Sequence, residues 1–511
     1  MIKRALISVW DKSGVLELAK FLIDNDIEII STGGTAKYLK DNSIDITPVS
    51  NITGLEAVMD GRVKTLNPKI FGGILADRNN DSHLKDLKNM SAGTIDLIVV
   101  NLYPFVKEAA EKKLPMDKAI EYIDIGGPSM LRAAAKNYHS VCVLSDVSDY
   151  SLFISNFNTD GKEIDLESRR IFASKVFQLT SNYDSQIFKY FNKQESENTL
   201  PKNKILHLSK VQDLRYGENP HQLGAFYLES DKQLDWVKHQ GKDLSYNNYL
   251  DLQSAYDIVG EFNDIACAII KHSNPCGFAT GNSLLEAYNR AVSCDPISYF
   301  GGIVSFNQKV SVEVAEELVK PFLECIIAPS FSKEALAILS KKKNLRVISM
   351  PQNKKVEPLE IKSASGGYLF QEKDSFYKKI KNCDIVTNKE PSADQFKALD
   401  LGWKIVRYVK SNAIVIANSQ QVLGIGAGQM SRIDSLKIAI RKIKEFNLNL
   451  NEAVIASDAF FPFSDSLEVA ADNGIVSIVQ PGGSIKDEEI IEKANQLGIS
   501  MVFTSERHFY H

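Results

Sequence analysis

The stretch RALISVWDKSGVLELAKFLIDNDIEIISTGGTAK (residues 4–37) decides the fold of the N-terminal part of the chain. RALISV is a short apolar run, and the helical period of VLELAKFLI follows it after the DKSG turn. IEII is a second apolar run, which leads through STGGT into a further helix. Strands that alternate with helices in this way are typical of a mainly parallel sheet with helices on both faces. We therefore predict an α/β fold.

The same alternation continues to about residue 190. DLIVVNLYPF (96–105) is typical of a buried strand that runs into a loop, and SVCVLSD (140–146) of a further strand. Between them, IDIGGPSMLRAAAKN (123–137) predicts a glycine-rich loop that feeds a helix. Residues 165–190 predict a long helix that closes this domain.

A polar segment punctuated by proline, FNKQESENTLPKNK (191–204), predicts the main domain boundary. We divide the chain into domains 1–197 and 198–511. The second domain is again mixed α/β, with ACAII and GGIVSF as strands. A second polar stretch, PQNKKVEPLEIKSA (351–364), divides it into two subdomains.

The two subdomains share a faint likeness that leaves an internal duplication open. IIKHSNPCG (269–277) and YVKSNAIVI (408–416) each combine a strand with a turn that contains Lys and Asn.

Composition excludes several classes of protein. The 511 residues include 60 basic and 64 acidic side chains, a net charge of −4, which argues against a generic nucleic-acid binder. No apolar run approaches the roughly 18 residues of a membrane span, and the first run ends at Trp10, before Asp11-Lys12, unlike a signal peptide. The six cysteines are scattered without a C-x-x-C pair, so we expect reduced thiols in a cytoplasmic protein.

Two N-terminal segments are suited to an anion. STGGT (31–35) lies between a strand and a helix, where glycines let backbone N–H groups approach a phosphate. The alternative is a tight turn in which Thr35 caps the helix. GRVKTLNPKIFGGIL (61–75) carries Arg62, Lys64 and Lys69, cations that suit a phosphate or a carbonyl oxygen, although a solvated basic loop is the simpler interpretation.

Candidate acid–base groups occur in the same part of the chain. Asp124 precedes two glycines, and Lys136 lies about three turns into the following helix, so the two side chains could form a pair in one pocket. The alternative makes Asp124 a capping residue and Lys136 a surface charge. Tyr103 follows a strand, and open α/β sheets build their sites at such strand ends. Its alternative role is packing.

Two polar loops stand out in the second domain. RYGENPHQ (215–222) is a polar loop, and KHSNPCG (271–277) places Lys271 and His272 directly after an apolar strand. The alternatives are a hydrogen-bonded surface loop and a satisfied core histidine. The zinc-deaminase pattern fails here, because H-x-E is absent and Cys276 has no partner three residues on. GIGAGQ (424–429) also fails the dinucleotide pattern, since position 429 is Gln.

Motifs along nearly the whole chain carry a resemblance to one known family. They are DKSG, STGGTAK, GRVKTL, NLYPF, IDIGGPSMLRAAAKN, LRYGENPHQ, LSYNN, KHSNPCG, FGGIV, IIAPSF, KSNAIV, GIGAGQMSR, SDAFFPF, VQPGGSI and RHFYH. In this order they resemble the bifunctional purine-biosynthesis enzymes that combine aminoimidazole carboxamide ribonucleotide (AICAR) transformylase with inosine monophosphate (IMP) cyclohydrolase. The resemblance implies an N-terminal methylglyoxal-synthase-like parallel-sheet domain and a C-terminal domain of two cytidine-deaminase-like α/β subdomains without zinc.

The resemblance implies that formyl transfer takes place in the second domain. 10-Formyltetrahydrofolate is the implied co-substrate, AICAR the acceptor and formyl-AICAR the product, with no metal required. His272 is the implied base and Lys271 an assisting acid or cation. The nucleotide would be held by Arg215, Tyr216, Asn248, Gly301, Glu324, Asn412, Arg432, Phe460 and Arg507. The folate would face Ile433, Asp465, Ser484 and Ile485.

Ring closure to IMP is the reaction implied for the first domain. Lys136 is the implied proton-transfer residue, with Asp124, Tyr103 and Lys64 orienting or stabilising the adduct. The nucleotide would be held by Lys12, Thr32, Gly33, Gly34, Thr35, Arg62, Thr65 and Asn101. The resemblance also implies a homodimer, small-molecule ligands only, and no nucleic-acid or membrane partner.

Three departures from the family pattern fall in the first domain: Trp10 where Ser is usual, and Asn67 and Phe71 where His is usual. Trp10 adds bulk beside the implied nucleotide site. We expect cyclohydrolase activity to survive, because Lys64, Tyr103, Asp124 and Lys136 are all present. The alternative is an active transformylase whose N-terminal domain binds nucleotide but is weakly active or inactive.

Overall fold

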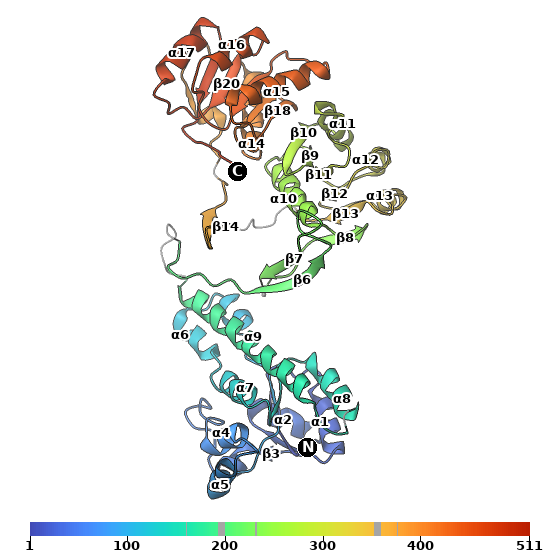
Figure 1. Ribbon diagram of the computed structural model, residues 1–511, viewed down its shortest axis with the longest axis vertical. Coiled ribbons are helices and arrows are strands. Elements are labelled where there is room, and N and C mark those ends of the chain that lie inside the picture. The colour runs from blue at the N-terminus through green and yellow to red at the C-terminus, as the bar shows by residue number, and fades with distance from the viewer. Residues whose placement is uncertain (160, 193–199, 230–231, 352–358, 376) are drawn as a thin grey trace. The chain divides into compact units, whose positions relative to one another are not determined.

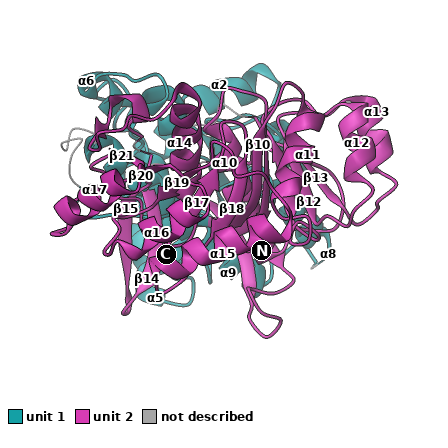
Figure 2. Cartoon of the chain, turned by 90° about the horizontal axis from the view of Figure 1, so that it is seen from above, with its two compact units in different colours: residues 1–208 teal, residues 209–511 magenta. Residues whose placement is uncertain are grey.

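The computed structural model describes residues 1–159, 161–192, 200–229, 232–351, 359–375 and 377–511 (Figure 1). The chain divides into two compact units, Met1–Leu208 and Ser209–His511 (Figure 2). The predicted boundary between residues 197 and 198 lies outside the described residues.

Unit 1 is built on a five-stranded sheet in the order β3-β2-β1-β4-β5, in which every pairing is parallel. The strands are β1 (Arg4–Ser8), β2 (Glu28–Ser31), β3 (Thr47–Pro48), β4 (Leu97–Val100) and β5 (Cys142–Leu144). The predicted α/β fold is confirmed. The chain winds outward from β1 in both directions, so the topological switch point lies between β1 and β4. In open parallel sheets, ligands bind at the carboxyl ends of the strands at this point.

The helices of unit 1 follow the expected apolar periodicity. They are α1 (Val15–Asp24), α2 (Gly33–Asp41), α3 (Val49–Thr53), α4 (Pro68–Leu75), α5 (Asp81–Asn89), α6 (Met116–Ala119), α7 (Gly126–Lys136), α8 (Asp149–Thr159) and α9 (Leu166–Phe191). In α1 the buried side chains are Val15, Leu18, Ala19 and Leu22, one face at helical spacing. The long closing helix predicted over 165–190 is α9, and it packs along α7.

Unit 2 contains two six-stranded mixed sheets. The first has the order β10-β9-β11-β12-β13-β8, formed by β8 (Val237–Gln240), β9 (Ala266–Lys271), β10 (Asn274–Thr280), β11 (Ile303–Phe306), β12 (Cys325–Ala328) and β13 (Arg346–Ser349). The second has the order β16-β21-β20-β19-β17-β18, formed by β16 (Asp384–Ile385), β17 (Ile414–Ala417), β18 (Val422–Gly426), β19 (Val454–Ser457), β20 (Ser477–Gln480) and β21 (Ser500–Phe503).

The two sheets are topological copies. Reversed, the second order reads β18-β17-β19-β20-β21-β16, and its parallel and antiparallel pairings match those of the first sheet one for one. The connecting helices also correspond: α10 (Tyr246–Gly260), α11 (Leu284–Cys294), α12 (Val312–Leu318) and α13 (Lys333–Leu339) against α14 (Ala393–Val406), α15 (Arg432–Glu445), α16 (Asp465–Asp472) and α17 (Asp487–Gln496). The structure therefore shows the duplication that the sequence leaves open.

The short sequence likeness that suggests the duplication does not relate equivalent positions of the two copies. Residues 271–274 form the turn between β9 and β10, whereas residues 410–412 lie between α14 and β17, before the strand. The two segments are not equivalent in the repeat, but they are in contact, because the Lys410 N–H donates to Asn274 Oδ1 at 3.0 Å.

A two-stranded hairpin precedes each sheet: β6 (Leu208–Leu214) with β7 (Gly224–Glu229), and β14 (Leu359–Ala364) with β15 (Gly367–Glu372). The end of the predicted dividing segment 351–364 is therefore strand β14, and its residues 352–358 lie outside the described part of the chain.

Candidate functional sites

The sites of unit 1 are gathered at the carboxyl ends of β1, β2 and β4. Trp10 and Lys12 follow β1, Thr32 caps the start of α2 after β2, and Asn101 follows β4. The Asn101 side chain ties two of these loops together. Its Oδ1 accepts from the Trp10 N–H at 2.5 Å and the Asp11 N–H at 3.0 Å, and its Nδ2 donates to Asp11 O at 3.0 Å.

The N-terminus of α2 provides the predicted anion-binding turn, with Thr32 at the cap position and Gly33 in the left-handed region at φ 54°. Gly34 has open space where a side chain would stand. The interpretation of Thr35 as the helix cap is wrong, because Thr35 is buried in the first turn. Its Oγ1 donates to Val9 O at 2.9 Å and accepts from Val9 N at 3.0 Å. Since this hydroxyl is committed, the turn offers an anion its backbone N–H groups.

Lys64, Asp124 and Tyr103 converge beside this turn. The Lys64 Nζ lies 3.3 Å from the position that a Cβ on Gly33 would take. Asp124 Oδ1 accepts from the Gly127 N–H at 2.8 Å at the start of α7. Burial raises the pKa of Asp124, and hydrogen bonds from the Gly127 and Tyr103 backbone and the charge of Lys64 only partly offset this effect. Burial, with the nearby charge of Asp124, also raises the pKa of Tyr103.

Three other predicted residues of unit 1, Lys12, Arg62 and Thr65, differ in their partners and in their burial. The Lys12 Nζ donates to the carbonyl of Val9 and, at 3.2 Å, to that of Trp10, and burial lowers its pKa. Arg62 is exposed and forms an ion pair with Glu121 at 2.5 Å. Thr65 is buried, and its Oγ1 lies 3.1 Å from the position of a Cβ on Gly126.

The structure does not bring Lys136 to Asp124 within the chain. Lys136 is the last residue of α7 and is exposed, whereas Asp124 stands just before its first turn. Ten residues of helix separate Gly126 from Lys136, or about 15 Å along the axis. Within the single chain the two residues therefore stand at opposite ends of α7, and the expectation that they share one pocket stays a prediction.

The three departures from the family pattern have structural roles. Trp10 packs on Tyr103 with ring centroids 4.7 Å apart. Asn67 caps α4, accepting from the Lys69 N–H at 2.9 Å, as Asn does well at this position. Phe71 packs against the core of unit 1.

In unit 2, the turn between β9 and β10 presents Lys271 and His272. Lys271 pairs with Asn274 across the hairpin, and the two turn residues, His272 and Ser273, are left-handed at φ 55° and 58°. Two-residue hairpin loops require positive φ, which Gly or Asn adopts most easily, so this turn is strained. Asp251 of α10 holds it, because its Oδ1 accepts from the Ser273 N–H at 2.6 Å.

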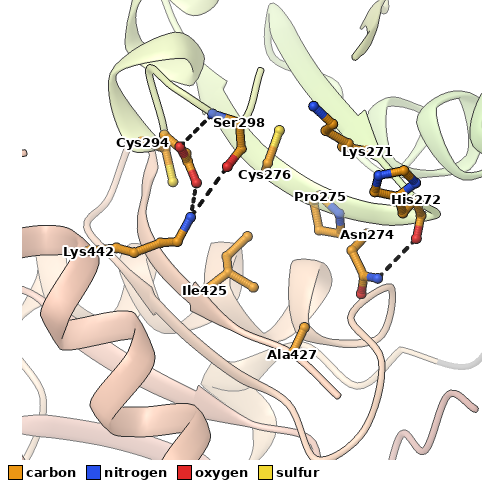
Figure 3. A pocket seen from close by; sticks show the side chains of 11 residues that line it. Lys271, His272, Asn274, Pro275, Cys276, Cys294, Ser298, Ile425, Ala427 and Lys442 are labelled. Carbon is orange, nitrogen blue, oxygen red and sulfur yellow. Dashed lines mark hydrogen bonds and ion pairs between the residues drawn. The ribbon is translucent and has the colours of Figure 1, made fainter. Parts of the chain in front are cut away.

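A cavity of about 310 Å³ adjoins this turn (Figure 3). It lies within unit 2, between the copy that contains the first six-stranded sheet and the copy that contains the second. Its lining residues are Lys271, His272, Asn274, Pro275, Cys276, Cys294, Asp295, Ser298, Ile425, Ala427 and Lys442. Lys271 Nζ donates to Phe300 O at 2.7 Å, and His272 is exposed. On the far side, Lys442 of the second copy forms an ion pair with Asp295 of the first.

The other predicted nucleotide residues of the first copy lie in two groups. Gly301, at φ 69°, donates to Phe322 O at 2.8 Å, beside Glu324, which forms an ion pair with Arg346 at 2.6 Å. The other group lies near the start of α10. Asn248 is buried in the cap of this helix, and its neighbour Asn247 donates to the loop that follows Arg215 and Tyr216.

A buried network centred on Arg432 brings together three predicted residues of the second copy. Its guanidinium donates to Asp458 Oδ1 at 2.7 Å, Asn412 Oδ1 at 3.0 Å and Phe460 O at 3.2 Å. Burial lowers the pKa of Arg432, and the charge of Asp458 opposes this. Arg507 is exposed, with its guanidinium 4.4 Å from the ring centre of Phe509.

The predicted folate residues lie on separate elements of the second copy. Ile433 packs partly against the core, Asp465 begins α16 and is exposed, and Ser484 and Ile485 precede α17. The structure gives no direct contact between these side chains and His272 among the described residues.

Sequence reasoning missed the residues that support the sites. Asp251 has no local signal, because its contact with Ser273 depends on how α10 packs. Asp295 and Lys442 are 147 residues apart in the sequence. Asp458 stands in the SDAFFPF motif, so its place beside Phe460 could have pointed to it.

The described ranges of the chain offer neither a metal centre nor a membrane span. Among the described residues, no group of three or more His, Cys, Asp or Glu side chains is arranged to hold a metal ion. Within those ranges, no helix is long and apolar enough to cross a membrane.

Comparisons with known proteins agree with this architecture. Residues 14–129 match the model of the MGS-like domain, and residues 134–442 match that of the AICARFT/IMPCHase bienzyme. The bifunctional purine biosynthesis protein PurH of Caldicellulosiruptor saccharolyticus is 47% identical over 520 residues, covering 100% of both chains. PurH of Clostridium botulinum strain Kyoto is 48% identical over 514 residues, again covering 100% of both. The resemblance is thus confirmed, and the chain belongs to the AICARFT/IMPCHase bienzyme family, which joins a formyltransferase to an IMP cyclohydrolase.

Proposed function

We propose that unit 2 transfers a formyl group from 10-formyltetrahydrofolate to the amine of AICAR, and that unit 1 closes the product to IMP. The observation that carries the proposal is the β9–β10 turn, which presents Lys271 and His272 beside the cavity of about 310 Å³. Unit 1 has its own separate set of acid–base groups, Lys64, Asp124 and Tyr103.

Formyl transfer needs a base, because the AICAR amine is a poor nucleophile whose lone pair is delocalised into the ring. In the proposed step, the amine nitrogen attacks the formyl carbon while His272 accepts its proton. The tetrahedral oxyanion then collapses, the bond from carbon to folate nitrogen breaks, and that nitrogen takes up a proton. Lys271, adjacent to His272, supplies a positive charge for the oxyanion or the proton for the leaving group.

Binding of the two substrates is assigned to the other predicted residues of unit 2. AICAR is held by Arg215, Tyr216, Asn248, Gly301, Glu324, Asn412, Arg432, Phe460 and Arg507, and the folate by Ile433, Asp465, Ser484 and Ile485. The buried pairing with Asp458 supports a fixed orientation of the Arg432 guanidinium, whose charge is already matched within the protein.

Ring closure needs positioning and proton transfer only. The carboxamide nitrogen attacks the formyl carbon, and water leaves after proton transfer to its oxygen. Tyr103, Asp124 and Lys64 are proposed to serve this step, with the phosphate of the nucleotide at the start of α2. A role for Lys136 remains a prediction, because it lies at the other end of α7.

We further propose a cytoplasmic homodimer with small-molecule ligands and no required metal. The six cysteines are all free thiols, which suits a reducing compartment. The homodimer rests on the family alone.

One reaction tests the proposal: the protein with AICAR and 10-formyltetrahydrofolate, with formyl-AICAR and IMP resolved by chromatography. We expect IMP to accumulate. Formyl-AICAR alone would favour the alternative in which unit 1 only binds nucleotide, and the absence of both products from folded protein would contradict the proposal.

A further inference from the structure

The aromatic pair formed by Trp10 and Tyr103 lies at the switch point of the sheet in unit 1. Ser8 of β1 is paired with Val100 of β4, and Trp10 and Tyr103 follow these strands by two and three residues. The two side chains therefore project from adjacent loops at the place where an open α/β sheet builds its ligand site.

Trp10 is held in place through its backbone rather than by burial of its ring. Its N–H donates to Asn101 at 2.5 Å, and its carbonyl accepts from Lys12 Nζ at 3.2 Å. Its side chain remains 46% exposed and is absent from the described core of unit 1. The indole therefore contributes little to the core of unit 1.

The Trp10 ring packs instead on Tyr103. The centroids of Trp10 and Tyr103 are 4.7 Å apart with planes tilted by 49°, within the favoured range for aromatic pairs. Tyr103 is itself 40% exposed, so little else described restricts its side chain on the solvent side. The indole limits the positions open to the phenol, which stands near the Asp124 carboxylate.

We propose that Trp10 is a positioning residue of the ring-closing site, because its indole holds the Tyr103 phenol in the orientation that serves the reaction. The inference rests on the proposed cyclohydrolase function of unit 1. Trp10 acts through Tyr103, so it affects the rate of the bound complex more than substrate binding.

The test uses the full-length protein with supplied formyl-AICAR and compares the wild type with Trp10→Ala and Trp10→Phe. We expect Trp10→Ala to lower kcat for IMP formation about ten- to a hundredfold, with KM changed less than about threefold. Trp10→Phe keeps an aromatic partner for Tyr103 and should retain at least about half of the wild-type kcat. Formyl transfer by unit 2, measured in the same preparations, controls for the amount of intact protein, and a KM for formyl-AICAR within about threefold of the wild type shows that unit 1 is folded.

The outcomes separate the inference from the function on which it rests. A wild-type protein that fails to cyclise formyl-AICAR contradicts the proposed function. A wild type that cyclises, with Trp10→Ala equally fast, overturns the positioning role. A rise in KM at constant kcat, or equal damage in Trp10→Phe and Trp10→Ala, also overturns it.

Fluorescence gives a second readout that does not depend on turnover. The chain has three tryptophans, Trp10, Trp236 and Trp403, and only Trp10 lies in unit 1. IMP should change the emission of the wild type and of Trp236→Phe, and this change should disappear in Trp10→Phe. An unchanged response in Trp10→Phe would show that IMP leaves the surroundings of the Trp10–Tyr103 pair unaltered, which overturns a role of this pair in the ring-closing site.

Discussion

His272 occupies a position whose backbone would be less strained with glycine or asparagine. Its φ of 55° and that of Ser273, 58°, are the left-handed values that a two-residue hairpin loop requires. A strained residue that lines a cavity is typical of a functional site, which supports the proposed catalytic role of His272.

His272→Ala should therefore abolish most formyl transfer while leaving ring closure intact. General-base catalysis is worth about a hundred- to ten-thousandfold, and we expect a loss in that range. Formyl-AICAR production from AICAR is the measurement, and IMP formation from supplied formyl-AICAR is the control. Equal loss of both activities would indicate misfolding or a wrong assignment.

Asp124 gives a second prediction at the residue scale, based on its raised pKa. Burial lifts this pKa above the ordinary value of 3.8, so the folded state binds a proton more tightly than the unfolded state does. The free energy of unfolding then falls as the pH rises from the ordinary pKa through the raised one. Asp124→Asn removes this dependence and keeps an oxygen for the Gly127 N–H.

We expect Asp124→Asn to be as stable as the wild type or more stable at neutral pH, yet to cyclise formyl-AICAR about a hundredfold more slowly. The wild-type rate should fall as acidification protonates the carboxylate. Urea unfolding at several pH values, followed by Trp10 fluorescence in a background that carries Trp236→Phe and Trp403→Phe, gives the stability of unit 1. A variant that is markedly less stable and equally active would refute this account.

At the scale of elements, helix α10 supports the catalytic turn. Asp251 accepts from Ser273, and without this acceptor the strained β9–β10 turn loses its anchor. Asp251→Ala should lower formyl transfer about ten- to a hundredfold, because small displacements of a catalytic base are costly. Asp251→Asn keeps an acceptor and is the matched control. Equal rates for both variants and the wild type would show that the turn holds itself.

Element positions also show how far the sequence could be read. The apolar runs and turns predicted β1, β2, β4 and the long helix α9, because period and punctuation are local signals. The end of the strand likewise predicted that Tyr103 lies at the carboxyl end of the sheet, after β4. The sequence could not reveal that Thr35 turns its hydroxyl onto Val9, or that Asp251 holds the β9–β10 turn. Both depend on how an element is placed in three dimensions.

At the scale of the whole molecule, the ion pair between Asp295 and Lys442 links the two copies within unit 2. Burial alone would raise the pKa of Asp295, but hydrogen bonds from Lys442 and Ser298 outweigh it and lower that pKa. The pair therefore stabilises the fold above the ordinary pKa of Asp295, and this contribution is lost as the pH falls through the lowered value.

Lys442→Met should destabilise unit 2, because Asp295 is left without its cation. We expect a loss of about 1–3 kcal/mol in the free energy of unfolding, which lies between the effects of breaking an exposed and a buried ion pair. Adding Asp295→Asn should recover part of this loss. Chemical unfolding of the four proteins in a double-mutant cycle measures the coupling. Strictly additive effects would show that the two side chains do not stabilise each other.

The two repeated sheets have different hairpins at equivalent positions, and only the first hairpin carries a proposed catalytic residue. In the first copy, β9 and β10 are joined by two residues, one of them His272. In the second, β17 and β18 are joined by residues 418–421, and this longer loop contacts the first copy instead, since Gln420 O accepts from Thr280 N at 2.7 Å. The second hairpin thus contacts strand β10 of the first copy, so it influences the catalytic turn through the shape of that strand and not through a reacting group of its own.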